Sequence, residues 1–266
     1  MTIQQFKVNL SKIISEEWRE EFQTSASTGL SQIQQILGGV QNSLQKFIDS
    51  TLFCTPSKIY PEKSKIFRAL KVCPPQDLKV VILGMDPYHT KGVADGLCFS
   101  TPSDLLYTPP SLKNIFRELE LEYDTLLLDP STDLERWGRQ GVLLLNTALT
   151  VYQGVPGSHA SIWKNFTEYL LTVISKAKSQ RRLIFLLWGN HAKSYKPFIN
   201  THRDFILEAV HPSPLSANRS PSGWFHNQHF LTTNELIFKH NGNMETINWI
   251  EWDKVKSNPS PSKLME

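Results

Sequence analysis

Four polar side chains that could act together in catalysis stand shortly behind apolar runs of the sequence. They are Asp86, Asn146, Asn190 and His211. A carboxylate, an amide and an imidazole that converge on one cleft can orient water, bind a hydrogen-bonding edge and stabilise a developing anion. The sequence therefore predicts an active site assembled from segments that lie far apart in the chain.

The first of these groups belongs to a dense cluster of reactive side chains in residues 78–95. The run 80–83 is β-branched and aliphatic, which is typical of a strand buried on both faces of a parallel sheet, and Gly84 ends it. Behind the glycine come Asp86, Pro87, Tyr88 and His89. Because ligands bind at the carboxyl ends of strands in open parallel sheets, we expect a binding site here.

The side chains near this expected site favour a nucleobase as the ligand. Asn146 can pair with the acceptor and the donor of an imide edge, Phe99 can stack on the ring, and Tyr88 can close one side of the slot. The sequence contains no GxSxG, GxxxxGK[ST] or GxGxxG motif, so acyl transfer, phosphoryl transfer and dinucleotide binding lose their best support.

Two segments rich in proline and serine predict contacts with a nucleic acid. Leu215 lies in the segment 213–216, which we expect to be exposed, and exposed apolar residues in stiff loops act as wedges in DNA. Together with Asn190, residues 109–111 and 213–216 could bind phosphates through hydroxyl, amide and backbone N–H groups. Positive charge is added by Lys193, Lys196 and Arg219.

The elements that must position these groups alternate between strands and helices. Apolar runs predict strands at 80–83, 142–145, 183–188 and 205–210, and residues 96–100 are expected to be extended. Apolar residues at intervals of three and four predict helices over 11–22, 33–48, 64–70, 109–119 and 162–174. This order predicts an α/β fold: a single domain with a central four-stranded parallel sheet flanked by helices on both faces.

We expect this domain to span residues 1–253, with the helices of residues 1–55 packed on it, and the polar tail 254–266 to be disordered. No apolar run approaches the roughly 20 residues that span a bilayer, and the amino terminus lacks the pattern of a secretory signal. The three cysteines are widely spaced without a CxxC pair, so we expect reduced surroundings and no disulfide framework or zinc site. The formal net charge of +3 permits a polyanionic partner without requiring one.

Six segments of the chain resemble the family 1 uracil-DNA glycosylases. They are GMDPYH (84–89), GLCFS (96–100), PPSLKNI (109–115), LLLNTALTV (143–151), FLLWGN (185–190) and HPSPLS (211–216). The resemblance implies a cofactor-free enzyme, without a metal, that excises uracil from DNA by hydrolysing the N-glycosidic bond and leaves an abasic site. It implies uracil-containing DNA as the partner of a monomer in the cytoplasm, or in the nucleus if the source is eukaryotic or viral, and it allows a proteinaceous inhibitor as a second partner.

The family's functional residues carry over to matching positions of this sequence. The resemblance implies that Asp86 orients the attacking water and stabilises the sugar cation, and that His211 donates a hydrogen bond to uracil O2. It implies that Asn146 reads the N3 and O4 edge, that Phe99 stacks on the ring, and that Tyr88 excludes thymine by meeting its 5-methyl group. The resemblance implies that Met85 contacts the base through its backbone N–H. It implies contacts with the DNA for Pro110, Ser111, Gly189, Asn190, Ser213, Leu215, Ser216 and Arg219.

Five features depart from the family pattern. Met85 and Val93 stand where glutamine is usual, Asp95 stands where histidine is usual, and Asn190 replaces a common serine. The segment 220–228 is longer than the usual stretch. We expect the changes at 93 and 95 to alter the water network beside the pocket. We expect the longer segment to reshape the leucine loop, which is the segment 211–216 around Leu215.

Structural interpretations exist for the same residues when each is taken alone. An aspartate before a proline commonly begins a turn, and asparagines behind apolar runs can end strands. An isolated histidine such as His211 is more often a structural residue than a catalytic one. His226 and His229 suggest a metal site, but no carboxylate or thiolate stands at a matching spacing.

Two other functions remain open from the residues. A non-catalytic DNA-binding protein on the same scaffold is expected to have lost Asp86, Tyr88 or His211, and all three are present. An unrelated α/β enzyme for a free nucleobase or nucleotide does not account for Leu215 in its proline-serine loop.

Overall fold

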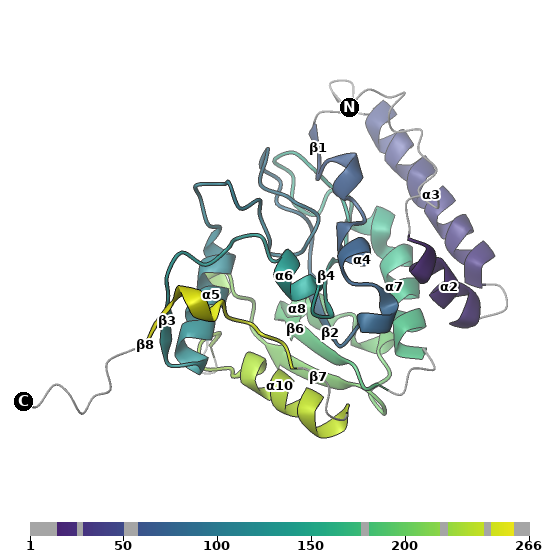
Figure 1. Cartoon of the computed structure of the whole chain (residues 1–266). Coiled ribbons are helices and arrows are strands. Elements are labelled where there is room, and N and C mark those ends of the chain that lie inside the picture. Colours follow the sequence, from purple (N-terminus) through teal and green to yellow (C-terminus); the bar gives the residue numbers. More distant parts are fainter. Residues whose placement is uncertain are drawn as a thin grey trace, which may run out of the picture.

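The computed structural model describes residues 15–25, 29–50, 58–176, 181–218, 223–241 and 246–257. Its centre is a four-stranded parallel sheet with the strand order β4-β2-β6-β7 (Figure 1). The strands are β2 (Val80–Gly84), β4 (Val142–Asn146), β6 (Ile184–Trp188) and β7 (Phe205–Ala209). Every residue of β2, β4 and β6 is buried, as continuous apolar runs predict, whereas β7 at the edge is partly exposed. The predicted sheet is confirmed.

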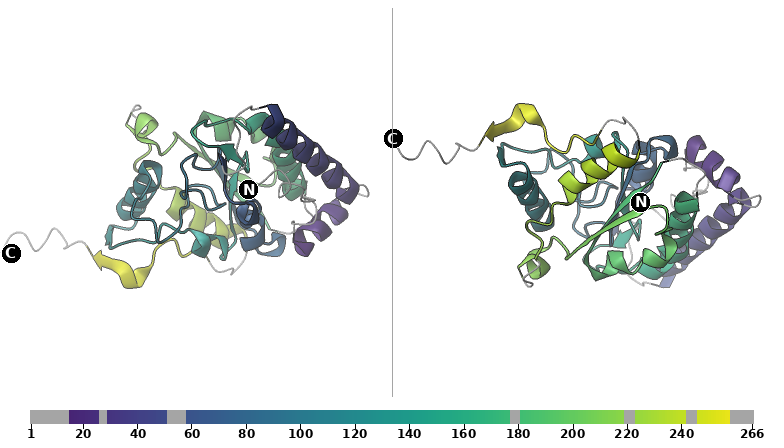
Figure 2. Two further views of the ribbon diagram at one scale, coloured as in Figure 1. Left: turned by 90° about the horizontal axis from the view of Figure 1, so that it is seen from above. Right: turned by 90° about the horizontal axis from the view of Figure 1, so that it is seen from below.

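Helices cover both faces of the sheet, as predicted (Figures 1 and 2). Helices α5 (Pro110–Glu122) and α10 (His229–His240) lie on one face. Helix α7 (Ala160–Lys176) lies on the other and is covered by α2 (Glu16–Ser25) and α3 (Gly29–Ser50). The chain moves from β2 to β4 in one direction along the sheet and from β4 to β6 in the other. Right-handed crossovers therefore place α5 and α7 on opposite faces.

The remaining elements are short. The helices are α4 (Arg68–Val72), α6 (Glu135–Gly138), α8 (Gly189–Lys193) and α9 (Pro214–Ala217), with 3-10 turns at Lys63–Lys65, Pro75–Asp77, Lys196–Phe198 and Trp252–Lys254. Two antiparallel pairs join β1 (Ile59–Tyr60) to β5 (Val151–Tyr152) and β3 (Thr125–Leu127) to β8 (Val255–Ser257). None of the helices in the described ranges is long and apolar enough to cross a membrane.

Most of the buried apolar side chains in the described residues form one hydrophobic cluster that extends from Trp18 in α2 to Ile250 near the carboxyl end. The Trp18 indole N–H donates to the carbonyl oxygens of Leu70 and Cys73 at 2.8 and 3.1 Å, which fixes α2 to the sheet domain. The described amino-terminal helices therefore share the core of the domain. Its outer bounds, with residues 1–14 and 258–266 outside the described part, stay a prediction.

The structure corrects two expectations about local conformation. Residues 96–100 form a turn rather than an extended segment, because Gly96 and Phe99 adopt positive φ angles of 96° and 63°. The expected disorder from residue 254 onward is also wrong for the first part of the tail. Leu128 N–H donates to the carbonyl oxygen of Lys254 at 2.7 Å, and β8 pairs with β3 in the register Leu127 to Val255. The pairing with β3 gives the backbone N–H and C=O groups of β8 hydrogen-bond partners, and the sequence pattern did not predict this pairing.

Candidate active site

The parallel register brings the ends of the four strands to one edge of the sheet. Gly84 at the end of β2 lies opposite Asn146 at the end of β4, and Trp188 at the end of β6 lies opposite Ala209 at the end of β7. Each predicted polar residue stands at most two residues beyond one of these ends. The sheet therefore brings together Asp86, Asn146, Asn190 and His211, as the sequence predicts.

Gly84 makes room for the side chain of Asn146. A Cβ atom at position 84 would lie 2.3 Å from Asn146 Oδ1 and 2.7 Å from Cys98 Cβ, so only glycine fits there. Asn146 is 5% exposed. Within the described part of the chain its side-chain amide makes no hydrogen bond, which leaves the donor and the acceptor free for a ligand with an imide edge.

His211 carries its proton on the nitrogen that faces away from its own loop. The backbone N–H of Ser213 donates to His211 Nδ1 at 3.0 Å, so the neutral ring must carry its hydrogen on Nε2. Burial lowers the pKa of His211, and the nearby His191 lowers it further. The ring is therefore a neutral Nε2–H donor at physiological pH.

An aromatic wall lies beside this imidazole. The ring centroid of Phe99 lies 5.8 Å from that of His211 and 5.6 Å from that of Trp188. The Tyr88 hydroxyl donates to the carbonyl oxygen of Phe99 at 3.1 Å, and burial raises the pKa of Tyr88 so that the phenol stays neutral. The left-handed turn at Phe99 thus places its ring next to the histidine and its carbonyl next to the Tyr88 phenol.

Asp86 has one oxygen occupied and one available. The backbone N–H of Gly157 donates to Asp86 Oδ2 at 2.5 Å, whereas Oδ1 makes no hydrogen bond to any described residue. Burial raises the pKa of Asp86, while the Gly157 hydrogen bond and the charges of His89 and His191 act in the opposite direction. These partners support the carboxylate form that could hold a water molecule on Oδ1.

Two polar residues of the site were not singled out from the sequence. Thr147 Oγ1 donates to the carbonyl oxygen of Met85 at 2.8 Å and lies 2.7 Å from His191 Nε2. Because the hydroxyl hydrogen goes to Met85, His191 must donate from Nε2 to Thr147. The signal for both was their position, since each directly follows a predicted strand-end asparagine.

The residues predicted to contact DNA lie on the rim of this edge. Leu215 in α9 is 70% exposed, and Met85 is 38% exposed. The side-chain amide of Asn114 in α5 donates to the carbonyl oxygen of Pro212 at 2.7 Å, so the start of α5 and the leucine loop are held next to each other. The remaining rim residues are at least partly exposed: Pro110, Ser111, Gly189, Asn190, Ser213 and Ser216. Arg219 lies outside the described residues.

The structure shows the surroundings of Asp95, of Val93 and of part of the longer segment, all of which depart from the family pattern. Asp95 is paired with Arg68 rather than open to water, and Val93 is buried. In the longer segment, the Trp224 indole N–H donates to the carbonyl oxygen of Asn114 at 3.0 Å, which ties the far end of the leucine loop to α5. The carboxylate of Asp95 accepts from three protein donors, the Arg68 guanidinium, the Leu97 N–H and the Ser100 hydroxyl. The expected change of the water network stays a prediction.

The histidines considered for a metal have other surroundings. The Trp188 indole N–H donates to His229 Nδ1 at 3.0 Å, and burial lowers the pKa of His229 to about 4. Among the residues that the structure describes, no group of three His, Cys, Asp or Glu side chains could hold a metal ion.

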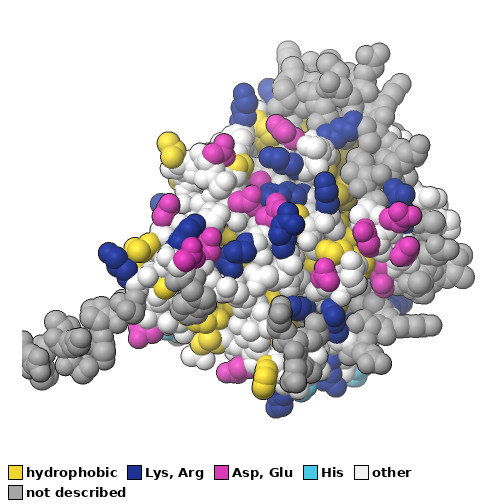
Figure 3. Space-filling model, viewed as in Figure 1, with side chains coloured by type: hydrophobic (Ala, Val, Ile, Leu, Met, Phe, Trp, Pro, Cys, Tyr) yellow, Lys and Arg dark blue, Asp and Glu magenta, His cyan; other side chains and the backbone are white. Residues whose placement is uncertain are grey.

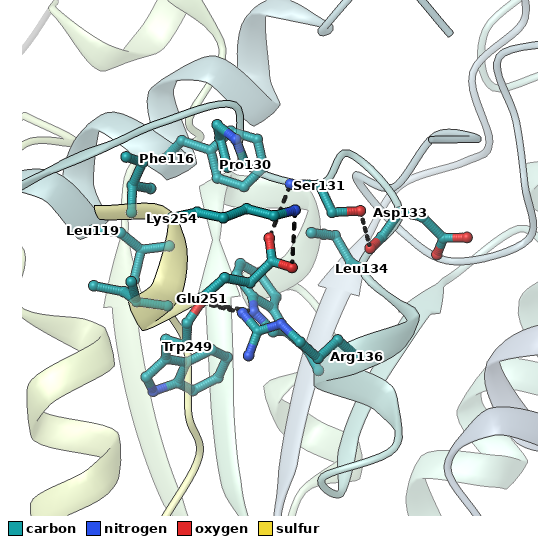
Figure 4. A pocket seen from close by; sticks show the side chains of 13 residues that line it. Phe116, Leu119, Pro130, Ser131, Asp133, Leu134, Arg136, Trp249, Glu251 and Lys254 are labelled. Atoms are coloured by element: carbon teal, nitrogen blue, oxygen red, sulfur yellow. Dashed lines mark hydrogen bonds and ion pairs between the residues drawn. The ribbon is translucent and has the colours of Figure 1, made fainter. Parts of the chain in front are cut away.

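A small cavity of about 20 Å³ lies away from the candidate site (Figure 4). It is enclosed by α5, α6 and the carboxyl-terminal segment, where Glu251 accepts from Ser131 N–H at 3.2 Å and pairs with Lys254 at 3.3 Å. None of its lining residues belongs to the candidate site. We interpret it as a gap left where the carboxyl-terminal segment packs on the domain.

Acidic and basic side chains are interspersed on the face shown in Figure 3.

A comparison with models of protein families identifies the family of this chain. A model described as the uracil DNA glycosylase superfamily matches residues 70–237, which include every strand of the central sheet. The chain belongs to the uracil DNA glycosylase superfamily. The resemblance drawn from the six sequence segments is thereby confirmed.

Curated relatives and solved structures agree with membership of this superfamily. A uracil-DNA glycosylase of Idiomarina loihiensis is 45% identical over 193 residues, covering 72% of this chain and 86% of that protein. One from Borrelia duttonii is 41% identical over 239 residues, covering 89% and 98%. The crystal structure of mimivirus uracil-DNA glycosylase aligns with a TM-score of 0.73 and 28% identity over 92% of this chain and 91% of that one. A mimivirus UNG variant in complex with UGI aligns with a TM-score of 0.77 and 26% identity over 92% of each chain.

Proposed function

We propose that this member of the superfamily excises uracil from DNA by hydrolysing the N-glycosidic bond, which leaves an abasic site. One observation carries the proposal: the free amide of Asn146, the Nε2–H donor of His211 and the aromatic wall of Phe99 and Tyr88 share one sheet edge with the Asp86 carboxylate. A non-catalytic relative on this scaffold would have no need of all these groups together.

In the proposed complex the uracil ring leaves the DNA stack and enters the slot. It stacks on Phe99, its N3 and O4 edge pairs with the Asn146 amide, and Tyr88 faces C5. Extrusion of a base costs a few kcal/mol, which the stacking and pocket hydrogen bonds offset. The backbone N–H of Met85 is proposed to contribute a further contact with the base.

The proposed reaction separates charge between the sugar and the base. As the C1′–N1 bond breaks, its electron pair goes to the base, and His211 Nε2–H stabilises the negative charge that builds on O2. Asp86 stabilises the cationic sugar and holds the attacking water on Oδ1. The water oxygen then bonds to C1′, and one of its protons is released.

The rim residues are proposed to hold the DNA on both sides of the flipped nucleotide. Pro110 and Ser111 at the start of α5, Gly189 and Asn190 at the start of α8, and Ser213 and Ser216 in the leucine loop offer backbone N–H, amide and hydroxyl groups to phosphates. Leu215 fills the gap that the base leaves in the stack. Arg219 is proposed to add positive charge beside them.

The UGI complex of a structural neighbour supports a proposal about partners. We expect a proteinaceous inhibitor of that kind to bind this chain on the DNA-contacting rim. A monomeric state and a cytoplasmic location stay predictions.

The proposed activity is tested with uracil-containing oligonucleotides, single-stranded and duplex, that are treated with alkali after incubation with the protein. We expect strand breaks at the uracil positions of both substrates, and none in matched oligonucleotides that carry thymine. Retention of the oligonucleotide without breaks would point to the non-catalytic DNA-binding alternative. A free base or nucleotide consumed in place of DNA would point to the unrelated enzyme.

Replacement of Tyr88 by alanine is expected to let thymine into the slot. A single methyl group in a pocket accounts for roughly 10- to 200-fold discrimination, so the ratio of uracil to thymine excision should fall by about that factor. The matched control is Tyr88→Phe, which keeps the ring and loses only the hydrogen bond to Phe99. Thymine excision is measured on duplexes with a single thymine mismatch, and its continued absence in the alanine variant would remove Tyr88 from the role of gate.

Replacement of Leu215 by alanine is expected to weaken excision from duplex DNA more than from single strands. Burial of a leucine side chain contributes roughly 1.5–3 kcal/mol, so we expect about a tenfold or larger loss on the duplex alone. The control is Phe238→Ala in α10, which truncates an apolar side chain of similar exposure, 68% against 70%, outside the rim. Equal losses on single-stranded and duplex substrates would argue against a wedge.

A further inference from the structure

Asp95 is a buried carboxylate whose contacts all lie within the protein. It is 1% exposed, and its Oδ2 accepts from Arg68 Nη1 at 2.7 Å and from the Ser100 hydroxyl at 2.5 Å. Its Oδ1 accepts from the backbone N–H of Leu97 at 3.0 Å. A buried charge is tolerated when such hydrogen bonds and an opposite charge surround it, so this carboxylate is held in one orientation.

The groups held by Asp95 stand on either side of Phe99. Leu97 and Ser100 flank the residue that adopts the left-handed φ of 63°, a conformation that a bulky side chain keeps only when its surroundings enforce it. Asp95 thus fixes the turn from both ends, and the turn sets the positions of the Phe99 ring and carbonyl. That carbonyl is the acceptor for the Tyr88 hydroxyl.

Arg68 joins this turn to the neighbouring segment 132–135. Its Nη2 lies 2.8 Å from Asp133 Oδ2 and 2.6 Å from Glu135 Oε2. On the same side, the backbone N–H of Leu134 donates to the Ser100 hydroxyl at 3.0 Å. The turn is therefore attached to the segment 132–135 through the Arg68 guanidinium and through the Ser100 hydroxyl. Both of these groups contact the Asp95 carboxylate.

We propose that Asp95, held by Arg68, is a positioning residue that sets the Phe99 turn and with it the positions of the Phe99 ring and the Tyr88 phenol that line the slot. The inference rests on the proposed function, because the slot is the proposed uracil site. Asp95 itself touches neither the base nor the reacting atoms. It acts through Phe99, whose ring is the proposed stacking surface for the base and whose carbonyl accepts from the Tyr88 hydroxyl.

The test compares Asp95→Asn with Glu135→Gln. Asparagine keeps the size of the side chain, but an NH2 donor replaces one of the two acceptor oxygens. This NH2 group then faces another donor, which is Arg68, Ser100 or Leu97. Glutamine at 135 loses a charge partner of Arg68 without a contact to the turn. We expect the inhibition constant of free uracil to rise about tenfold in Asp95→Asn and to change by less than about twofold in Glu135→Gln.

Two further readouts separate slot geometry from general loosening. Affinity for an abasic duplex should stay within about threefold of the wild type in both variants, because the rim residues are unchanged, whereas the uracil to thymine ratio should fall only in Asp95→Asn. If Asp95→Asn does not fold, Ser100→Ala removes one contact of the same carboxylate, and we expect a rise of about threefold in the inhibition constant.

Different outcomes of these tests would overturn the proposed function and the inference about Asp95. A wild-type protein that releases no uracil overturns the function and the inference with it. An active wild type with an unchanged inhibition constant in Asp95→Asn, or in Ser100→Ala where the first variant does not fold, overturns the inference alone. Equal changes in Asp95→Asn and Glu135→Gln also overturn it, because the effect would then belong to the ion-pair network as a whole.

Discussion

The Asp86→Asn variant is expected to excise uracil about 10²- to 10⁴-fold more slowly than the wild type while it still binds DNA. The amide matches the carboxylate in shape and can still accept from Gly157 N–H, but it carries no charge to stabilise the sugar cation or to hold the water. Single-turnover excision and abasic-duplex binding measure the two properties separately. Unchanged turnover would remove Asp86 from the reaction.

The pH dependence of this variant provides a control for the role of the charge. Because burial raises the pKa of Asp86 above its ordinary value of 3.8, the active carboxylate form is lost at a higher pH than for an exposed aspartate. The wild-type rate should therefore fall as the pH is lowered toward that raised pKa. The residual rate of Asp86→Asn should lack this acid limb.

The same shift gives the sign of the effect on stability. A carboxyl whose pKa is raised by folding favours the folded state below its unfolded pKa, and this contribution is lost as the pH rises through the folded pKa. At neutral pH the charged Asp86 therefore opposes folding. Thermal unfolding of Asp86→Asn should occur at the same or a higher temperature than that of the wild type. A lower midpoint would contradict the burial argument.

The His211→Leu variant is expected to lose about 10²- to 10³-fold in kcat, with a smaller change in KM. Leucine fills a similar volume but offers no donor to the developing anion on O2, so the loss falls on the transition state. His202→Leu, which makes the same substitution at an exposed position away from the site, is the matched control. A loss confined to KM would show that His211 binds the ground state and does not stabilise the anion.

The architecture was predictable because each buried strand appears in the sequence as a continuous apolar run. In a parallel sheet the carboxyl ends share one edge, so polar residues behind such runs must meet there. The pairing of Gly84 with Asn146 and of Trp188 with Ala209 shows this geometry directly. No side-chain contact had to be known in advance.

Other parts of the site could not be predicted because they depend on contacts between distant segments. The Gly157 N–H that holds Asp86 is a backbone group and has no side-chain signature. The turn at Phe99 requires a positive φ that local propensity opposes, and it depends on Asp95 and Arg68, which come from different elements. Likewise, the order of residues 255–257 comes from pairing with β3.

The central claim is that one slot holds the uracil between the aromatic wall and the polar groups of the sheet edge. A crystal structure of this protein with free uracil tests it most directly. We predict the ring stacked on Phe99, O2 within hydrogen-bond distance of His211 Nε2, and the N3 and O4 edge on the Asn146 amide. Uracil bound elsewhere, or bound in the slot without a contact to either His211 or Asn146, would contradict the account.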